Sequence, residues 1–327
     1  MTSFLSRFKL SIIVFLIVVS LLSFLQIKLD KPMILLERFI VGGGWIELVI
    51  VGLYASVVVY KMNDPKQVSK WRKFTWTLFS VVFFSQLILG IVGFEKFLMT
   101  ADKLHLPVPA IILAGPVYRF EIGFMTVLFI STIILSGPAW CSHLCYFGAL
   151  DNISLKGKPK KGRIKNRTAF KVTILVFIIS GALIMKLLGS STLTAAIAGG
   201  TFGIIGLLVI ILLSRKKAKM IHCTVYCPIG TLVNYLKYIN PFRMYIDNNC
   251  TECNLCTKYC TYDALNLEDI LNKKPSITCT LCGDCVTSCH TGSIKYKFFN
   301  LDHKKSRNLY LVITVSLHAL FLALARL

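Results

Sequence analysis

Residues 250–260, "CTECNLCTKYC", and residues 279–289, "CTLCGDCVTSC", decide how the polar part of this chain folds. Each run has four cysteines, with two residues between successive members of the first three and three residues before the last. Thiolates are soft ligands that select zinc or iron–sulfur clusters. Zinc sites usually take their ligands as two pairs. Two complete runs of four cysteines therefore favour two cubane clusters over zinc.

The spacing is that of bacterial two-cluster ferredoxins, in which the fourth cysteine of each run binds the other cluster. Three closely spaced thiolates can hold three corners of one cube, and the fourth reaches the second cube. We therefore assign to a first [4Fe–4S] cluster Cys250, Cys253, Cys256 and Cys289. We assign to a second [4Fe–4S] cluster Cys279, Cys282, Cys285 and Cys260. The usual proline after the fourth cysteine is replaced by Thr261 and His290, which changes the local turn and removes no ligand.

The rest of the chain is strongly apolar. It has 327 residues, of which 55% are hydrophobic, and a mean hydropathy of +0.68. This composition predicts a mainly α polytopic membrane protein that carries a small α+β ferredoxin-like segment. Apolar runs predict seven spans, near 10–27, 40–60, 75–93, 122–138, 172–188, 194–213 and 309–325. By chemistry the chain divides into a membrane domain at 1–240, a ferredoxin domain at 241–300 and a last span in 301–327.

The net charge of +22 would suggest a nucleic-acid partner in a soluble protein. Here the basic residues gather in the loops 61–73 and 151–168 and directly after the sixth span, and these stretches alternate with charge-balanced ones. Positive loops stay in the cytoplasm. We therefore expect no nucleic acid, a multi-pass protein of a prokaryotic inner membrane, a cytoplasmic ferredoxin segment and a C-terminus outside.

An internal repeat carries the remaining four cysteines. "CSHLCYFGALDN" (141–152) and "CTVYCPIGTLVN" (223–234) agree at five of twelve positions. We interpret the repeat as parallel, relating spans three and four to spans five and six, with one copy at the cytoplasmic end of span four and one at that of span six. Cysteines four apart face the same way on a helix. Cys141, Cys145, Cys223 and Cys227 then either hold a third iron–sulfur cluster or are buried free thiols that pack.

Together these motifs resemble the membrane polyferredoxins of the NapH, NosR and CcoG type. That group combines several spans, two C-x3-C-P motifs and a two-cluster ferredoxin segment. The second motif here, ending in Pro228, fits the pattern, whereas the first has Tyr146 in place of proline. The resemblance covers roughly residues 40–300.

The resemblance implies electron transfer between cytoplasmic or quinol donors and a redox partner in the membrane or outside it, as a subunit of an oxidoreductase. The implied partners are redox proteins in or on the membrane, quinone, and cytoplasmic ferredoxin or flavodoxin. The alternative is an accessory factor that supplies electrons for metalloenzyme maturation or for redox-linked regulation, as some relatives do.

Two ionisable residues lie within predicted spans, where such residues are functional candidates by default. Glu47, near the outer end of span two, either accepts a quinol proton or sits at the interface bonded to Trp45 or Arg38. His318 lies in the middle of the last span. A haem needs a second axial histidine at similar depth, and no other predicted span offers one. We therefore expect His318 to be a packing residue with a hydrogen bond.

Overall fold

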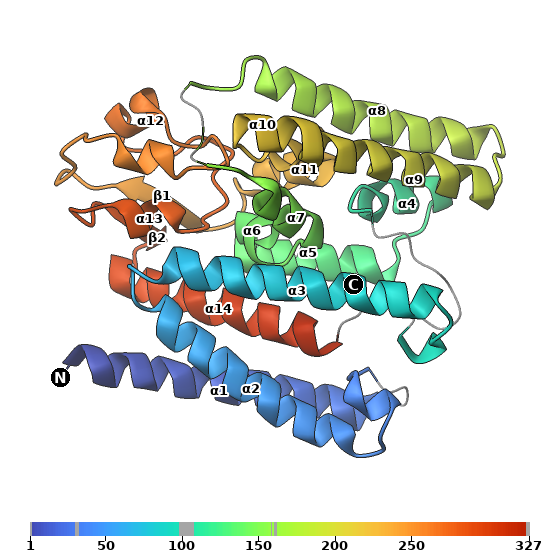
Figure 1. The fold of residues 1–327 in the computed structure, drawn as a ribbon, viewed down its shortest axis with the longest axis horizontal. Coiled ribbons are helices and arrows are strands. Elements are labelled where there is room, and N and C mark those ends of the chain that lie inside the picture. The colour runs from blue at the N-terminus through green and yellow to red at the C-terminus, as the bar shows by residue number, and fades with distance from the viewer. Residues whose placement is uncertain (1, 30–32, 98–107, 158, 160–161, 325–327) are drawn as a thin grey trace. The chain divides into compact units, whose positions relative to one another are not determined.

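Seven helices of this protein are long and apolar enough to cross a membrane (Figure 1). The structure is a computed structural model that describes residues 2–29, 33–97, 108–157, 159 and 162–324. Within those residues the candidate spans are Arg7–Lys28, Gly43–Met62, Val68–Ile91, Thr126–Ser154, Arg167–Leu187, Thr192–Lys217 and His303–Leu324. Each overlaps one of the apolar runs identified above, so the expected mainly helical, polytopic architecture is confirmed at this level.

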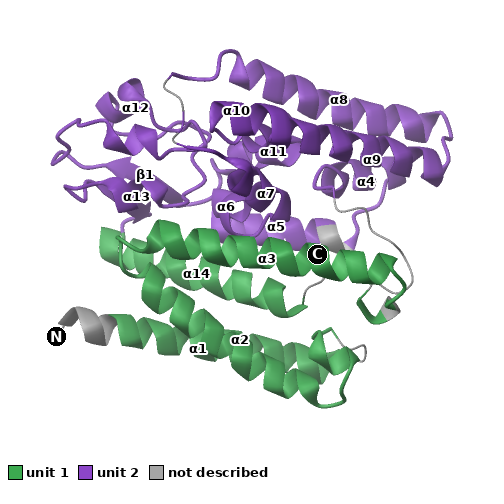
Figure 2. Ribbon diagram, viewed as in Figure 1, with its two compact units in different colours: residues 1–105, 301–327 green, residues 106–300 purple. Residues whose placement is uncertain are grey.

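The chain forms two compact units, and the first combines both ends of the sequence (Figure 2). Unit 1 comprises Met1–His105 and Leu301–Leu327. Its helices are α1 (Thr2–Lys28), η1 (Leu36–Arg38), α2 (Gly43–Met62), α3 (Val68–Ile91), η2 (Glu95–Phe97) and α14 (His303–Leu324). The last helix packs against the first three. Apolar side chains line both the inside and the outside of this unit, as lipid contact requires.

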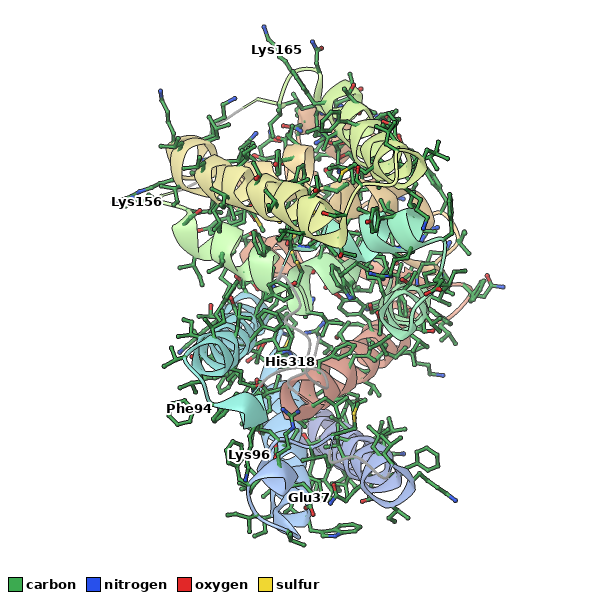
Figure 3. All side chains as sticks on the ribbon, turned by 90° about the vertical axis from the view of Figure 1, so that its right-hand side faces the viewer. Glu37, Phe94, Lys96, Lys156, Lys165 and His318 are labelled. Carbon is green, nitrogen blue, oxygen red and sulfur yellow. The ribbon has the colours of Figure 1, made fainter. Side chains whose placement is uncertain are left out.

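The ionisable residues in the spans of unit 1 have specific partners. Figure 3 labels His318 of α14. The Nε2 atom of His318 lies 3.0 Å from the hydroxyl of Tyr54, and the ring of Phe79 meets its ring edge-on, with the centroids 5.9 Å apart. His318 is therefore a packing residue with a hydrogen bond, as expected. Glu47 Oε2 accepts from the backbone N–H of Leu36 at 2.6 Å. The carboxylate thus ties the start of α2 to η1, with a backbone partner that the sequence did not indicate.

Unit 2 spans Leu106–Asn300 and holds all the cysteines. Its helices are α4 (Ile111–Arg119), α5 (Phe124–Ser136), η3 (Gly137–Ala139), α6 (Trp140–His143), α7 (Tyr146–Ser154), α8 (Arg167–Leu187), α9 (Thr192–Leu208), η4 (Val209–Ser214), α10 (Arg215–Lys217), η5 (His222–Tyr226) and α11 (Pro228–Leu236). The elements η4 and η5 are π-helical turns. Such turns are rare in proteins, and those that occur often lie at functional sites.

The segment with ferredoxin spacing belongs to unit 2 as well. It contains β1 (Phe242–Ile246), η6 (Leu255–Lys258), α12 (Leu267–Leu271), α13 (Asp284–Ser288) and β2 (Ile294–Phe298). The two strands pair antiparallel, from Phe242 opposite Phe298 to Ile246 opposite Ile294. This pairing brings the two ends of the segment together around its eight cysteines. A small α+β element is therefore present. The ferredoxin fold itself stays a prediction, as do the domain boundaries at 240 and 300.

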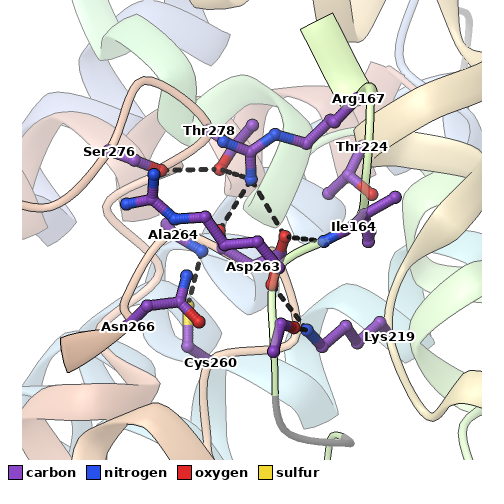
Figure 4. A network of polar contacts seen from close by, with 12 residues as sticks. Ile164, Arg167, Lys219, Thr224, Cys260, Asp263, Ala264, Asn266, Ser276 and Thr278 are labelled. Carbon is purple, nitrogen blue, oxygen red and sulfur yellow. Dashed lines mark hydrogen bonds and ion pairs between the residues drawn. The ribbon is translucent and has the colours of Figure 1, made fainter. Parts of the chain in front are cut away.

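A buried ionic network anchors this segment to the membrane helices (Figure 4). Asp263 is only 2% exposed, and its carboxylate binds Lys219 Nζ at 2.5 Å and Arg167 Nη1 at 3.2 Å. The same guanidinium donates to the backbone oxygen of Asp263 at 2.7 Å and to Thr278 at 3.2 Å. The segment is thereby fixed to the start of α8 and to the chain that follows α10.

The network gives two of the basic residues near the spans partners inside the protein. Arg163 and Arg167 pair with acidic residues of the ferredoxin-like segment, Asp269 and Asp263 respectively. Lys156 and Lys165 instead project from the ribbon into the surroundings (Figure 3). Three other residues of the basic loop lie outside the described residues: Lys158, Lys160 and Lys161.

Candidate metal centres

The structure describes all twelve cysteines, and no disulfide joins them. Solvent exposure of the cysteines decreases from the first ferredoxin-type run to the second run and the paired motifs. Cys253 is exposed, and its neighbours in the first run are half-buried. In the second run Cys279 and Cys285 are buried. In the paired motifs Cys141, Cys145 and Cys227 are all at most 8% exposed.

One group of thiols gathers around Cys256. Burial raises the pKa of Cys256 to about 11, and negative charge on Cys289, Cys250 and Cys253 adds to the effect. The last cysteine of the second run therefore lies beside the first three cysteines of the first run. This is the proximity that the first assigned cluster requires. Ligation itself stays a prediction.

A second group gathers around Cys285 and Cys260. Burial raises the pKa of Cys285, followed by the effects of Cys282, Cys279 and Cys260 and of Cys256 from the first group. Burial also raises the pKa of Cys260, and Cys282 contributes next. The fourth cysteine of the first run thus lies among the first three of the second run. The crossed assignment of the second cluster stays a prediction.

The paired motif in span four differs from the expected helix face. Helix α6 ends at His143, and Cys145 is extended, with φ −80° and ψ 115°. Cys141 and Cys145 therefore do not lie on one continuous helix, and that prediction is wrong. Cys145 instead caps the N-terminus of α7, and its sulfur accepts from the N–H of Gly148 at 3.4 Å. A helix N-terminus stabilises a thiolate, because its unpaired N–H groups carry positive partial charge.

The second copy repeats this local structure. Cys227 is also extended, with ψ 119°, and occupies the N-cap position of α11, without the side-chain cap hydrogen bond of Cys145; α11, like α7, has nine residues. Burial raises the pKa of Cys227, whereas the backbone N–H groups of Gly230 and Ile229 oppose that rise. The twelve-residue repeat therefore corresponds to a repeated structure of cysteine, break and short helix. The larger repeat of paired spans stays a prediction.

The two copies bring their four thiols together. Burial raises the pKa of Cys223 well above its usual value, and Asp151, Cys145, Cys227 and Cys141 each contribute. Asp151 Oδ2 accepts from the N–H of Cys223 at 3.0 Å and so joins α7 to η5. The backbones are tightly packed here, since a Cβ on Gly230 would lie 2.6 Å from the carbonyl oxygen of Cys223. We call these four cysteines the paired-cysteine site.

Three polar residues beside the paired-cysteine site were not identified from the sequence. They are Asp151, His222 and Lys171. His222 lies between the rings of Phe147 and Tyr226, with centroids 5.5 and 5.4 Å away, and burial lowers its pKa to about 4. Lys171 of α8 is 5% exposed, and its Nζ lies 3.5 Å from the carbonyl oxygen of Gly230. Only Asp151 could have been noticed in the sequence, because the repeat has an acidic residue at this position in the first copy and an apolar one, Val233, in the second.

The residues fit iron–sulfur clusters better than a single metal ion. In the described part of the chain, no group of three or more His, Cys, Asp or Glu side chains is compact enough for one ion. A zinc ion would draw each sulfur to about 2.3 Å. A cubane spreads its thiolates over four corners. Cysteines in groups of four, close enough to affect one another's charge, match that wider arrangement.

Two hydrogen bonds link the paired-cysteine site to the second group of the ferredoxin-like segment. The hydroxyl of Tyr262 donates to the carbonyl oxygen of Cys141 at 3.3 Å. The hydroxyl of Ser142 donates to the backbone carbonyl oxygen of Thr280 at 3.1 Å. Tyr262 follows Cys260 by two residues, and Thr280 follows Cys279 directly. The two groups of cysteines are therefore held in a fixed relation.

Comparisons with known proteins agree with this chemistry. A family described as a 4Fe-4S binding domain matches residues 118–164 and 200–242. Each match contains one of the two cysteine pairs, and both end before Cys250. An uncharacterized protein of Methanocaldococcus jannaschii is 25% identical over 252 residues, covering 75% of this chain and 94% of the relative. No solved structure matches. The two family matches support a ferredoxin-type iron–sulfur protein with a role in electron transfer.

Proposed function

We propose that this protein carries electrons between a soluble redox partner and the membrane, as polyferredoxins of the NapH and NosR type are expected to do. The observation that carries the proposal is the pair of matches to a 4Fe-4S binding domain, in a compact unit that also holds all twelve cysteines with no disulfide among them. When bound, an iron–sulfur cluster accepts and releases single electrons. The proposed complement is three clusters, with two on the ferredoxin-like segment and one at the paired-cysteine site.

The exposure of the cysteines supports the two ends of this path. Cys253 is exposed, so the first group is the one that a soluble partner can approach. Cys141 and Cys145 are buried and belong to the candidate span Thr126–Ser154. The second group lies between these extremes and is tied to the paired-cysteine site through Tyr262 and Ser142. The order of the groups therefore runs from an exposed surface toward the membrane helices.

An iron count tests the proposed number of clusters. Full-length protein, purified anaerobically and fully reconstituted, should hold about twelve irons, since each cubane has about four. Replacing both Cys141→Ala and Cys223→Ala should leave about eight irons, because both halves of the paired-cysteine site then lose a thiolate. The matched control, Val225→Ala, changes a residue between the second pair of cysteines and should keep the full count. About eight irons in the reconstituted wild type would contradict the third cluster.

Orientation is a second part of the proposal. The alternation of basic and charge-balanced loops places the ferredoxin-like segment in the cytoplasm and the C-terminus outside. A topology reporter fused after Leu327 should then be active on the outer side of the inner membrane, and one inserted near Lys66 on the inner side. Activity of the Leu327 fusion in the cytoplasm would contradict the proposed orientation.

A further inference from the structure

We propose that two lysines, the buried Lys171 and the half-buried Lys237, set the reduction potentials of two neighbouring clusters separately, with Lys171 acting on the paired-cysteine site and Lys237 on the second ferredoxin-type group. The inference rests on the proposed function, because it concerns clusters held by these cysteines. It adds a role for residues that hold no metal. Both are positioning residues that would act through their charge.

Lys171 is placed where its charge meets the paired-cysteine site. Helix α8 packs against both η5 and α11, the elements that carry Cys223 and Cys227. The Lys171 ammonium lies within 3.5 Å of the carbonyl oxygen of Gly230, three residues after Cys227. Its charge acts on Cys227, for which it opposes the rise in pKa caused by burial. The side chain therefore reaches the thiols from a third helix.

A buried ammonium in a membrane span requires negative partners. The charge is costly in a dry environment unless it is paired. The charged neighbours of Lys171 are the thiols of Cys141, Cys227 and Cys223, together with Arg167, which is itself positive. The Asp151 carboxylate accepts from the backbone N–H of Cys223 at 3.0 Å. The thiolates of a loaded site would supply the negative charge that this lysine needs.

Lys237 has the matching position at the second group. Its Nζ lies 3.3 Å from the carbonyl oxygen of Cys279 and 3.4 Å from that of Ser276. Cys279 is one of the second group's cysteines, and Lys237 interacts with it electrostatically. Lys237 directly follows α11, whose first residue directly follows Cys227. One short helix thus connects the two sites, and each site has its own lysine.

A nearby positive charge raises the reduction potential of a cluster. Reduction adds one electron to a group that already carries thiolate charge, and a buried cation stabilises that added charge. The stabilisation is large at close range and in low dielectric, so each lysine should affect its own site far more than the other. Removal of the charge should make that site harder to reduce.

The test is an anaerobic redox titration of the full-length, reconstituted protein in lipid nanodiscs, followed by electron paramagnetic resonance. In Lys171→Met, the reduced-to-oxidised ratio of the paired-cysteine site at a fixed potential should fall at least tenfold, a shift of about 59 mV for one electron. Lys171→Arg keeps the charge and should restore most of the potential. Lys237→Met should lower the reduction potential of the second group by a similar amount and leave the potential of the paired-cysteine site unchanged. The exposed Lys165→Met is the control and should change neither.

Iron content measured on the same samples separates the possible failures. About twelve irons in Lys171→Met with unchanged potentials would overturn the inference and leave the proposed function standing. Loss of about four irons in both Lys171→Met and Lys171→Gln would also overturn it, since the charge would then serve assembly. Equal shifts of both sites in either variant would refute separate control. About eight irons in the wild type would instead remove the paired-cysteine cluster on which the inference rests.

Discussion

Replacement of Asp263 by asparagine should lower the free energy of unfolding by about 3–5 kcal/mol, which is the usual cost of breaking a buried ion pair from one side. The carboxylate is 2% exposed and accepts from both Lys219 and Arg167. An asparagine of the same shape is neutral, so both cations would lose their counter-charge in a buried site. The loss can be measured by denaturant unfolding in detergent, followed by the visible absorbance of the reconstituted protein.

The control for this variant is a carboxylate in the same segment. Glu268 pairs with Arg163 at 3.2 Å, but its side chain is 70% exposed. Exposed ion pairs contribute at most about 1 kcal/mol, so Glu268→Gln should have little effect. Equal stability losses in the two variants would show that burial of the Asp263 network does not anchor the segment.

Replacement of Gly230 by alanine should disrupt the paired-cysteine site. The added Cβ would lie 2.6 Å from the backbone oxygen of Cys223, and a backbone atom cannot swing aside as a side chain can. Overpacking of this kind costs about 1–3 kcal/mol. It also separates η5 from the start of α11, and with them the two cysteines of the second pair. We expect the variant to lose about four irons on reconstitution while the ferredoxin-type groups keep theirs.

Gly181→Ala provides the comparison for this substitution. Gly181 lies inside α8, and a Cβ there would meet no atom within 4 Å. Alanine favours a helix interior over glycine by up to about 1 kcal/mol, so this change should be neutral or stabilising. Full iron content in Gly230→Ala would mean that the close approach of the two backbones is not needed for the site.

Much of the architecture follows from local sequence patterns. Hydropathy locates the seven candidate spans of the described residues, because each contains a long apolar run. The ends are less well defined, since α8 and α14 begin with polar residues such as Arg167 and His303. The spacing of the ferredoxin-type cysteines predicts a crossed arrangement of the two runs, and this arrangement stays a prediction.

The rest depends on contacts between distant parts of the chain. Asp263 meets Lys219 and Arg167 across 44 and 96 residues, and no periodicity encodes such pairs. Lys171 reads as an ordinary basic residue at the start of a span until α8 is packed against α11. The break between Cys141 and Cys145 was missed because a spacing of four favours a helix face. The extended Cys145 shows that capping by the thiol took precedence over helix continuity.

The division of the chain into units also orders its biogenesis. Helix α14 packs against α1 and α2, yet the ribosome makes it only after the whole of unit 2. The first three helices must therefore wait in the bilayer without their last neighbour while residues 106–300 are synthesised. The cysteine-rich segment is therefore complete before unit 1 can close.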